Sequence, residues 1–127
     1  MVSMRNNAYE KRFIGMNPKI VQPKLTHVEF KIDEMRLKGT LYQPPGPATG
    51  TIIGCHGLIS DRTSPKQQVL ASHCVELDMA YFAFDHRGCG ESEGKFETVT
   101  TLDNRIRDLL AAVEYIRHQT KPGKYIG

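Results

Sequence analysis

Two short runs of apolar residues, each followed by a glycine-rich stretch, constrain the fold of this chain most strongly. The runs cover residues 51–55 and 79–84, and a segment with helical periodicity lies between them. Short, wholly apolar strands are typical of a parallel sheet that is buried on both faces. Strands that alternate with helices also favour right-handed crossovers. The sequence therefore predicts an α/β fold whose glycine-rich loops share the carboxyl end of the sheet.

An antiparallel hairpin is expected before these strands. Residues 27–32 and 36–42 alternate polar and apolar side chains, which predicts two strands with one wet face each. Asp33 and Glu34 form the turn between them. The prolines of residues 44–47 end the hairpin, because proline cannot donate to a sheet.

Two helices are expected as crossovers. The first begins at Ser64, which can cap it, with Pro65 at the first helical position and Gln67 completing a capping box. The second begins within residues 100–103 and is stopped by residues 121–123. The apolar side chains at helical spacing are Val69, Leu70, Cys74 and Leu77 in the first helix, and Leu102, Ile106, Leu109, Leu110, Val113 and Ile116 in the second. An ion pair is expected between Asp103 and Arg107, four residues apart.

The chain divides into a basic lead-in and a near-neutral body. Residues 1–26 carry five Lys or Arg and one acid, and they read as irregular. Residues 27–127 form the predicted domain. This charge pattern gives little support to a nucleic-acid partner. The longest apolar runs are about half a dozen residues, too short to span a membrane.

Three cysteines cannot all pair within one chain, which fits a reducing cytoplasm better than a disulfide scaffold. Cys55 and Cys74 are expected to be buried, and Cys89, in a glycine-rich loop, to be exposed. No Cys or His spacing resembles a zinc site. We therefore expect neither a metal nor a cofactor.

The end of the first apolar strand has the pattern of an oxyanion donor loop. Hydrolysis of an ester or amide creates an oxyanion, which a preorganised backbone N–H stabilises by about 3 kcal/mol. His56 and Gly57 follow the strand, and the glycine would let the backbone turn so that Leu58 N–H faces the cleft. We expect Gly57→Val to destroy this turn. An ordinary tight turn is the alternative interpretation.

The second loop carries a longer motif, Asp-x-Arg-Gly-x-Gly-x-Ser. Its members are Asp85, Arg87, Gly88, Gly90 and Ser92. Together with the preceding His-Gly pair, it resembles the N-terminal half of the α/β-hydrolase fold over roughly residues 27–127. Residues 94–100 and the following helix resemble esterases of the feruloyl or cinnamoyl type, and serine aminopeptidase-like enzymes and lipases share this layout.

The resemblance implies a role for each motif residue. Asp85 would support the donor loop, and Arg87 would be a structural ion-pair partner, with Gly88, Gly90 and Ser92 as further support. The parent enzyme would use a serine nucleophile on a small ester or amide substrate, without metal or cofactor. Nucleophile, acid and base would lie beyond Gly127. The chain would thus be an α/β-hydrolase sheet that is incomplete at its C-terminus, ending before the nucleophile elbow and inactive alone.

Residues 90–94 match Gly-x-Ser-x-Gly, the pattern of a nucleophile elbow, but in the wrong context. An elbow needs a strand directly before the motif and a helix directly after it. The strand ends near Phe84 and the helix begins near Thr101, so Ser92 is not expected to be the nucleophile. No histidine is expected to be a general base: His56 belongs to the donor turn, His86 occupies a variable motif position, and His27, His73 and His118 read as surface residues.

Two other readings remain open. The chain could be a non-catalytic half-domain that pairs with a complementary chain or with itself, because the strand of residues 51–55 would lack the neighbour that starts at Lys124. Gly88, Gly90 and Gly94 also resemble a dinucleotide fingerprint, but their spacing is one residue too long, and no helix begins there.

Overall fold

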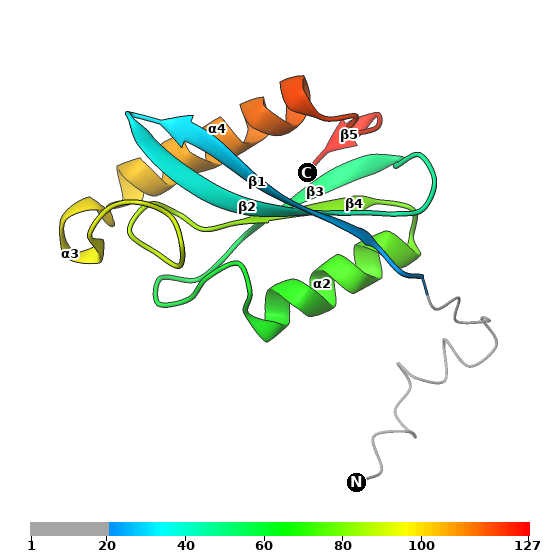
Figure 1. The fold of residues 1–127 in the computed structure, drawn as a ribbon, viewed down its shortest axis with the longest axis horizontal. Coiled ribbons are helices and arrows are strands. Elements are labelled where there is room, and N and C mark those ends of the chain that lie inside the picture. Colours follow the sequence, from blue (N-terminus) through cyan, green and yellow to red (C-terminus); the bar gives the residue numbers. More distant parts are fainter. Residues whose placement is uncertain (1–20) are drawn as a thin grey trace, which may run out of the picture.

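The computed structural model describes residues 21–127, without the side chain of Gln119. Within this range the chain forms a five-stranded sheet with three helices (Figure 1). The elements in chain order are β1 (Lys24–Ile32), β2 (Met35–Gln43), β3 (Gly50–Cys55), α2 (Pro65–Glu76), β4 (Ala80–Phe84), α3 (Phe96–Val99), α4 (Leu102–Gln119) and β5 (Tyr125–Ile126). The lead-in up to residue 20 lies outside the described residues.

The sheet order is β1-β2-β4-β3-β5. β1 pairs antiparallel with β2, and β2 pairs antiparallel with β4. β3 pairs parallel with both β4 and β5. The predicted α/β fold, a hairpin followed by parallel strands with helical crossovers, is therefore confirmed.

The hairpin is longer than the sequence pattern indicated, because β1 begins at Lys24 and not at residue 27. Asp33 and Glu34 both have positive φ, 50° and 64°, as a two-residue hairpin turn with the right-handed twist requires. Aspartate is one of the residue types that tolerate a positive φ. The Asp33 carboxylate accepts a hydrogen bond from Arg107. The prediction of an Asp103–Arg107 ion pair is wrong, because Arg107 pairs with Asp33 of the hairpin turn instead.

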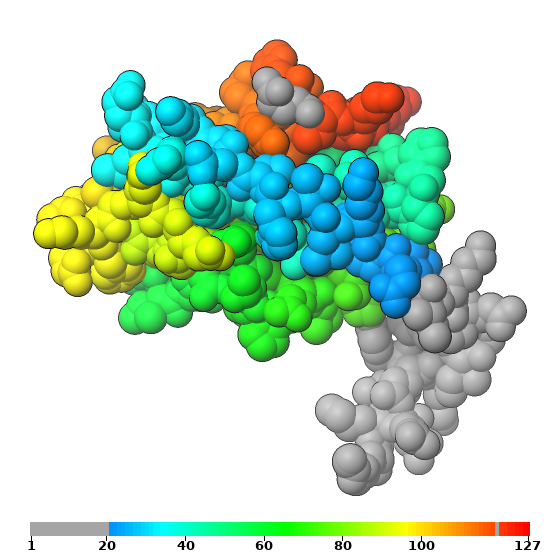
Figure 2. Space-filling view, viewed as in Figure 1, coloured from blue at the N-terminus to red at the C-terminus, as the bar shows by residue number. Residues whose placement is uncertain are grey.

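β4 is the centre of the molecule, and all five of its residues are buried. Phe82 and Phe84 pack toward Ile116 of α4 on one face of the sheet. Tyr81 and Ala83 pack toward Ala71 of α2 on the other. Figure 1 shows α4 and α2 on opposite sides of the sheet, and Figure 2 shows the β1–β2 hairpin across the middle of the viewed face.

Helix α2 buries a different face from the one its apolar spacing predicted. Its buried residues are Gln67, Ala71 and Val75, whereas Val69, Leu70 and Leu77 are exposed. Pro65 does occupy the first turn, but the Ser64 side chain makes no cap. The predicted capping box is also wrong, because Gln67 Oε1 accepts a hydrogen bond of 2.6 Å from the buried Tyr81 hydroxyl.

Helix α4 also leaves part of its predicted apolar side exposed, although its N-terminus is capped. Thr101 caps it by accepting from Asn104 N–H at 3.1 Å. The side chains fully buried against the sheet are Asp108, Ala112 and Ile116. Of the predicted stripe, Leu102, Ile106 and Leu110 face solvent, with exposed fractions of 74%, 48% and 59%. Only part of the expected apolar face therefore packs on the sheet.

The strand at the C-terminal end covers part of the β3 edge. Tyr125 and Ile126 lie opposite Gly50 and Thr51, and Gly127 O accepts from Ile53 N–H at 2.7 Å. The expectation that β3 lacks this neighbour is therefore wrong over its first half. No helix within residues 21–127 is long and apolar enough to cross a membrane.

Candidate active site

The two glycine-rich loops lie side by side at the carboxyl end of the sheet. β3 and β4 are parallel neighbours, and their last residues, Cys55 and Phe84, are paired. The loops that follow therefore leave the sheet at the same edge. His86 N–H donates to His56 Nε2 across 3.1 Å, which joins the start of one loop to the start of the other.

Asp85 ties the two loops together. Its carboxylate is fully buried and accepts the Arg62 N–H at 2.7 Å, the Arg62 guanidinium and the Glu91 N–H at 3.0 Å. The Arg62 guanidinium also binds Glu91 at 2.7 Å. Asp85 thus supports the end of the loop that contains Leu58. Its partner Arg62 was missed, because nothing local in the sequence relates residues 23 positions apart.

Arg87 pairs with a helix and not with Asp85. Its Nε donates to Asp108 Oδ1 at 2.7 Å and its backbone N–H to Asp108 Oδ2 at 2.9 Å. A further nitrogen of Arg87 lies 3.2 Å from Asp33. Burial would raise the pKa of Asp108, but hydrogen bonds from His86 and Arg87 hold that pKa below its ordinary value. The two charged motif residues therefore belong to separate ion pairs, Asp85 with Arg62 and Arg87 with Asp108.

The remaining motif residues shape the second loop. Gly90 has φ +51°, and a Cβ at this position would lie 2.4 Å from the Asp85 carboxylate. Gly88 also has a positive φ, of +79°. The Ser92 hydroxyl donates to Asp85 O at 2.6 Å and accepts from Lys38 N–H at 2.9 Å. Both hydrogen bonds are to backbone groups, as in a structural serine.

The turn after β3 does not depend on its glycine in the way the sequence suggested. Gly57 lacks a positive φ, and nothing lies within 4 Å of where its Cβ would be. The expectation that Gly57→Val destroys the turn therefore loses its physical basis. No N–H of residues 57–61, that of Leu58 included, donates a hydrogen bond to another group of residues 21–127.

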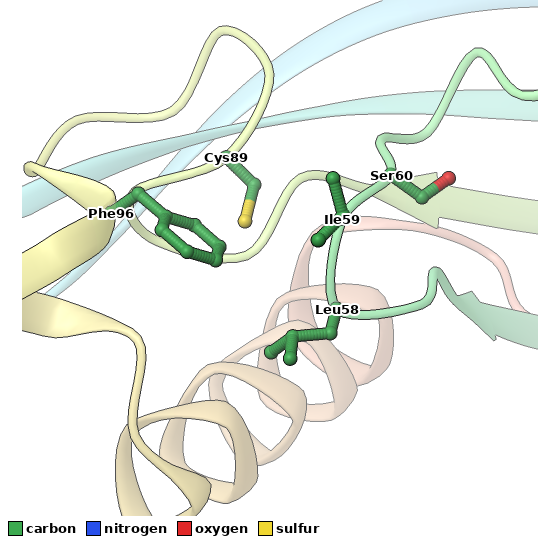
Figure 3. Close-up of a pocket in the computed structure, with 5 residues that line it drawn as sticks. All are labelled: Leu58, Ile59, Ser60, Cys89 and Phe96. Atoms are coloured by element: carbon green, nitrogen blue, oxygen red, sulfur yellow. The ribbon is translucent and has the colours of Figure 1, made fainter.

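A small apolar pocket of about 210 Å³ opens between the loops (Figure 3). It is lined by Leu58, Ile59, Ser60, Cys89 and Phe96. Figure 3 shows Cys89 and Phe96 on one side and the Leu58–Ser60 segment on the other, with the Ser60 hydroxyl pointing away. The pocket is thus lined by apolar side chains from both loops and from α3.

The cysteines differ from their expected environments. Cys55 is exposed at the end of β3, Cys74 is half-buried, and Cys89 is buried in its loop. All three are free thiols, and burial raises the pKa of each above its ordinary value. None of them is therefore an activated thiolate.

Two of the histidines are buried at the junction of the loops. His56 and His86 pack edge to face with their ring centroids 5.1 Å apart. Burial lowers the pKa of His56 below its ordinary value. His86, which the motif treated as variable, is 3.3 Å from Asp108. His27, His73 and His118 are exposed, as predicted.

No group of three or more His, Cys, Asp or Glu side chains in the described part of the chain could hold a metal ion.

A comparison with protein families gives a match over residues 46–126 to the family described as serine aminopeptidase, S33. The chain belongs to the S33 serine aminopeptidase family. The matched residues include both loops and the pocket between them. The resemblance to α/β hydrolases that the motifs predicted is thereby confirmed.

Curated relatives of this S33 family member include the uncharacterized protein YfhR of two Salmonella. The chain is 31% identical to the protein of Salmonella typhi and 34% identical to that of Salmonella typhimurium, over 80 residues in each case. These matches cover 63% of the chain and 25% of each relative. The chain thus spans about a quarter of the length of the relatives it matches.

Solved structures with this fold include esterases. The esterase Pf2001 of Pyrococcus furiosus superposes with a TM-score of 0.70 at 26% identity, over 83% of this chain and 41% of that one. Est1E of Butyrivibrio proteoclasticus, solved with ferulic acid bound, gives 0.73 at 22% identity, over 79% and 41%. A serine hydrolase homologue of Coxiella burnetii gives 0.63 at 21% identity, over 80% and 50%. The S33 chain therefore has the fold of the N-terminal portion of α/β hydrolases.

Proposed function

We propose that residues 27–127 form the N-terminal portion of a serine hydrolase that transfers the acyl group of carboxylic esters or small amides in the cytoplasm. Leu58 N–H is the oxyanion donor, and His56 and Gly57 form the turn that presents it. Asp85, Arg87, Gly88, Gly90 and Ser92 support the loops. The nucleophile, acid and base are not among these 127 residues, so the chain by itself is inactive, and the reaction uses no cofactor.

One observation carries this proposal: Leu58, whose N–H donates to no other group of residues 21–127, lines an apolar pocket at the edge where two parallel strands end. An acyl-transfer site needs a backbone donor next to a place for the acyl group. The hydrogen bond and ion pair between Asp85 and Arg62 hold the donor loop in place before any substrate binds. Such preorganisation is what makes a backbone donor effective.

The inactivity of the chain alone is tested with a p-nitrophenyl ester and a fluorophosphonate probe, which labels activated serines. We expect no turnover above buffer and no stoichiometric labelling. Ser92→Ala is the matched control, because Ser92 has the only local sequence pattern of an elbow. Labelling that disappears in Ser92→Ala would show that the serine is a nucleophile and would refute this assignment.

The donor role is tested in an extended protein that joins this chain to a segment carrying a serine nucleophile. Leu58→Pro removes the N–H, whereas Leu58→Ala keeps it and removes only the side chain. We expect Leu58→Pro to lower kcat by about 10²- to 10³-fold, as for loss of one oxyanion donor. Equal effects of the two substitutions on kcat would exclude Leu58 N–H as the donor.

A second function is favoured by the uncovered side of α4, where Leu102, Ile106 and Leu110 are exposed. Contiguous exposed apolar surface is typical of sites that contact another chain. Under this alternative the chain is a non-catalytic half-domain that pairs with a complementary chain or with itself. Sedimentation velocity distinguishes the two, because a stable monomer at all concentrations would argue against self-association.

A further inference from the structure

The orientation of the Leu58 N–H is set by its peptide group. The peptide that joins Gly57 to Leu58 is planar, so the Gly57 carbonyl and the Leu58 N–H turn as one unit. In a trans peptide they point in opposite directions, and the described residues contain no cis peptide. Any group that fixes the Gly57 oxygen therefore also fixes the direction of the Leu58 N–H.

The His56 imidazole is the group that binds this oxygen. His56 Nδ1 lies 2.7 Å from Gly57 O, which is hydrogen-bond distance. Gly57 has no positive φ, and a Cβ at this position would meet open space, so the turn does not require a glycine there. The side chain of the preceding histidine thus does what the sequence motif attributed to the glycine.

The other ring nitrogen of His56 determines which nitrogen carries the proton. Nε2 lies 3.1 Å from the backbone N–H of His86, which is a donor only, so Nε2 must be unprotonated. The neutral ring then carries its proton on Nδ1 and donates it to Gly57 O. The hydrogen-bond network therefore assigns a single tautomer to His56.

Residue 56 is also held through its backbone and through its neighbours. The Arg105 guanidinium of α4 donates to His56 O. The His86 ring packs against the His56 ring and is tied by Nδ1 to Asp108, which Arg87 also binds. The second loop and α4 thus both fix the imidazole that holds the Gly57 carbonyl.

We infer that His56 is a positioning residue, whose neutral imidazole, protonated at Nδ1, orients the Gly57–Leu58 peptide so that Leu58 N–H is presented as the oxyanion donor. This inference rests on the proposed function of Leu58. His56 touches no reacting atom and acts only through the peptide. A protonated ring would carry a hydrogen on Nε2 that faces the His86 N–H, so acid would release the ring and the peptide with it.

The groups that face His56 agree with a neutral ring. Burial lowers its pKa most, and the positive charge of Arg105 and the neighbouring His86 lower it further. The hydrogen bond to Gly57 and the charge of Asp85 act in the opposite direction. Asp61, on the same loop, also interacts with His56. The net direction keeps the imidazole uncharged at neutral pH.

The direct test is NMR of the 127-residue chain with ¹⁵N label. Long-range ¹H–¹⁵N spectra at neutral pH should show His56 with a protonated Nδ1 and an unprotonated Nε2. A coupling across the hydrogen bond should join the His86 amide nitrogen to His56 Nε2. A proton on Nε2, or a charged ring at neutral pH, would overturn the inference without requiring any variant to fold.

A second measurement follows the Leu58 amide itself. Its chemical shift should titrate together with the His56 ring, with a midpoint below about 6.5, the ordinary pKa of histidine. In His56→Ala the titration of Leu58 should vanish, whereas His73→Ala, at an exposed position on α2, should leave it unchanged. A Leu58 amide that does not follow His56 would contradict the positioning role.

The extended protein separates this inference from the proposed function. His56→Ala should lower kcat on the order of 10- to 100-fold, less than loss of the donor itself, with little change in KM. If Leu58→Pro leaves kcat unchanged, the donor assignment fails, although the His56 tautomer stands. If His56 has the other tautomer while Leu58→Pro removes activity, only the positioning role fails.

Discussion

At the scale of single residues, the site depends on a few buried charged side chains that form ion pairs with one another. Asp85 and Arg62 satisfy each other at the junction of the two loops, and Asp108 does the same for Arg87 and His86. A buried charge is tolerated only when it is paired, and removing one partner leaves the other uncompensated. The loops should therefore respond sharply to substitutions in these pairs.

Asp85→Asn should be among the most destabilising changes in the domain. It leaves the buried Arg62 guanidinium without its main counter-charge, which costs about 3–5 kcal/mol in comparable cases. The measurement is the free energy of unfolding in urea. Lys38→Gln, which breaks only the exposed pair with Glu29, is the control and should change this free energy by less than about 1 kcal/mol. Equal losses of unfolding free energy in the two variants would contradict a stabilising role of the Asp85–Arg62 pair.

Two glycines of the site should respond in opposite ways to alanine. Gly90→Ala places a Cβ against the Asp85 carboxylate at a positive φ, which should cost about 2–3 kcal/mol or more. Gly57→Ala meets open space and should change the free energy of unfolding by less than about 0.5 kcal/mol. Urea unfolding of both variants measures these changes. A large loss of unfolding free energy in Gly57→Ala would show that the turn does require the glycine.

His56 should make stability depend on pH in a defined window. Its folded-state pKa is below that of the unfolded chain, so the unfolded state binds the proton first as pH falls. The stabilisation is complete above about pH 6.5 and is lost as pH falls toward the folded pKa. Urea midpoints between about pH 7.5 and about pH 5.5 measure this loss.

The acid sensitivity should be assignable to this one residue. His56→Gln should flatten the pH dependence, whereas His73→Gln should preserve it, because His73 is exposed. Asp108, whose pKa is also lowered, loses its contribution only at more acidic pH, below the ordinary aspartate range. An unchanged profile in His56→Gln would assign the effect to another group.

At the scale of elements, apolar residues of the helices are distributed over two sides, and only one packs on the sheet. Ile116→Ala should cost about 2–5 kcal/mol, as for other large-to-small changes in a core. Ile106→Ala, ten residues earlier on the exposed side of α4, should cost less than about 1 kcal/mol. Similar losses in thermal or urea unfolding would show that the exposed side is covered in solution.

The helices also show where sequence reasoning reached its limit. Strands and loops were predictable, because an apolar run and a glycine-rich stretch are local signals. The packed side of α2 was not predictable, because the buried Gln67 side chain is satisfied by a hydrogen bond from the Tyr81 hydroxyl, 14 residues away. The partners of Asp85 and Arg87 were likewise set by the sheet and α4, which bring Arg62 and Asp108 to them. The motif residues were found, but not the residues that hold them.

At the scale of the whole molecule, β4 is buried on both faces and paired on both edges, whereas β5 has two residues and one paired edge. Amide hydrogen exchange should therefore be slowest for β4 and fastest for β5 among the strands. Mass spectrometry of exchanged fragments, or NMR, measures this gradient. Uniform protection of β4 and β5 would indicate that something else covers the open edge.

The position of β4 between β2 and β3 also has a consequence for synthesis on the ribosome. The β1–β2 hairpin leaves the ribosome first, but its inner neighbour, β4, is made roughly forty residues later, which takes about 2–8 seconds at ordinary rates of translation. During this interval the inner edge of β2 is unpaired and open to other nascent chains. Rare codons between Gln43 and Ala80 would lengthen the interval, so the speed of translation there should affect the yield of folded protein.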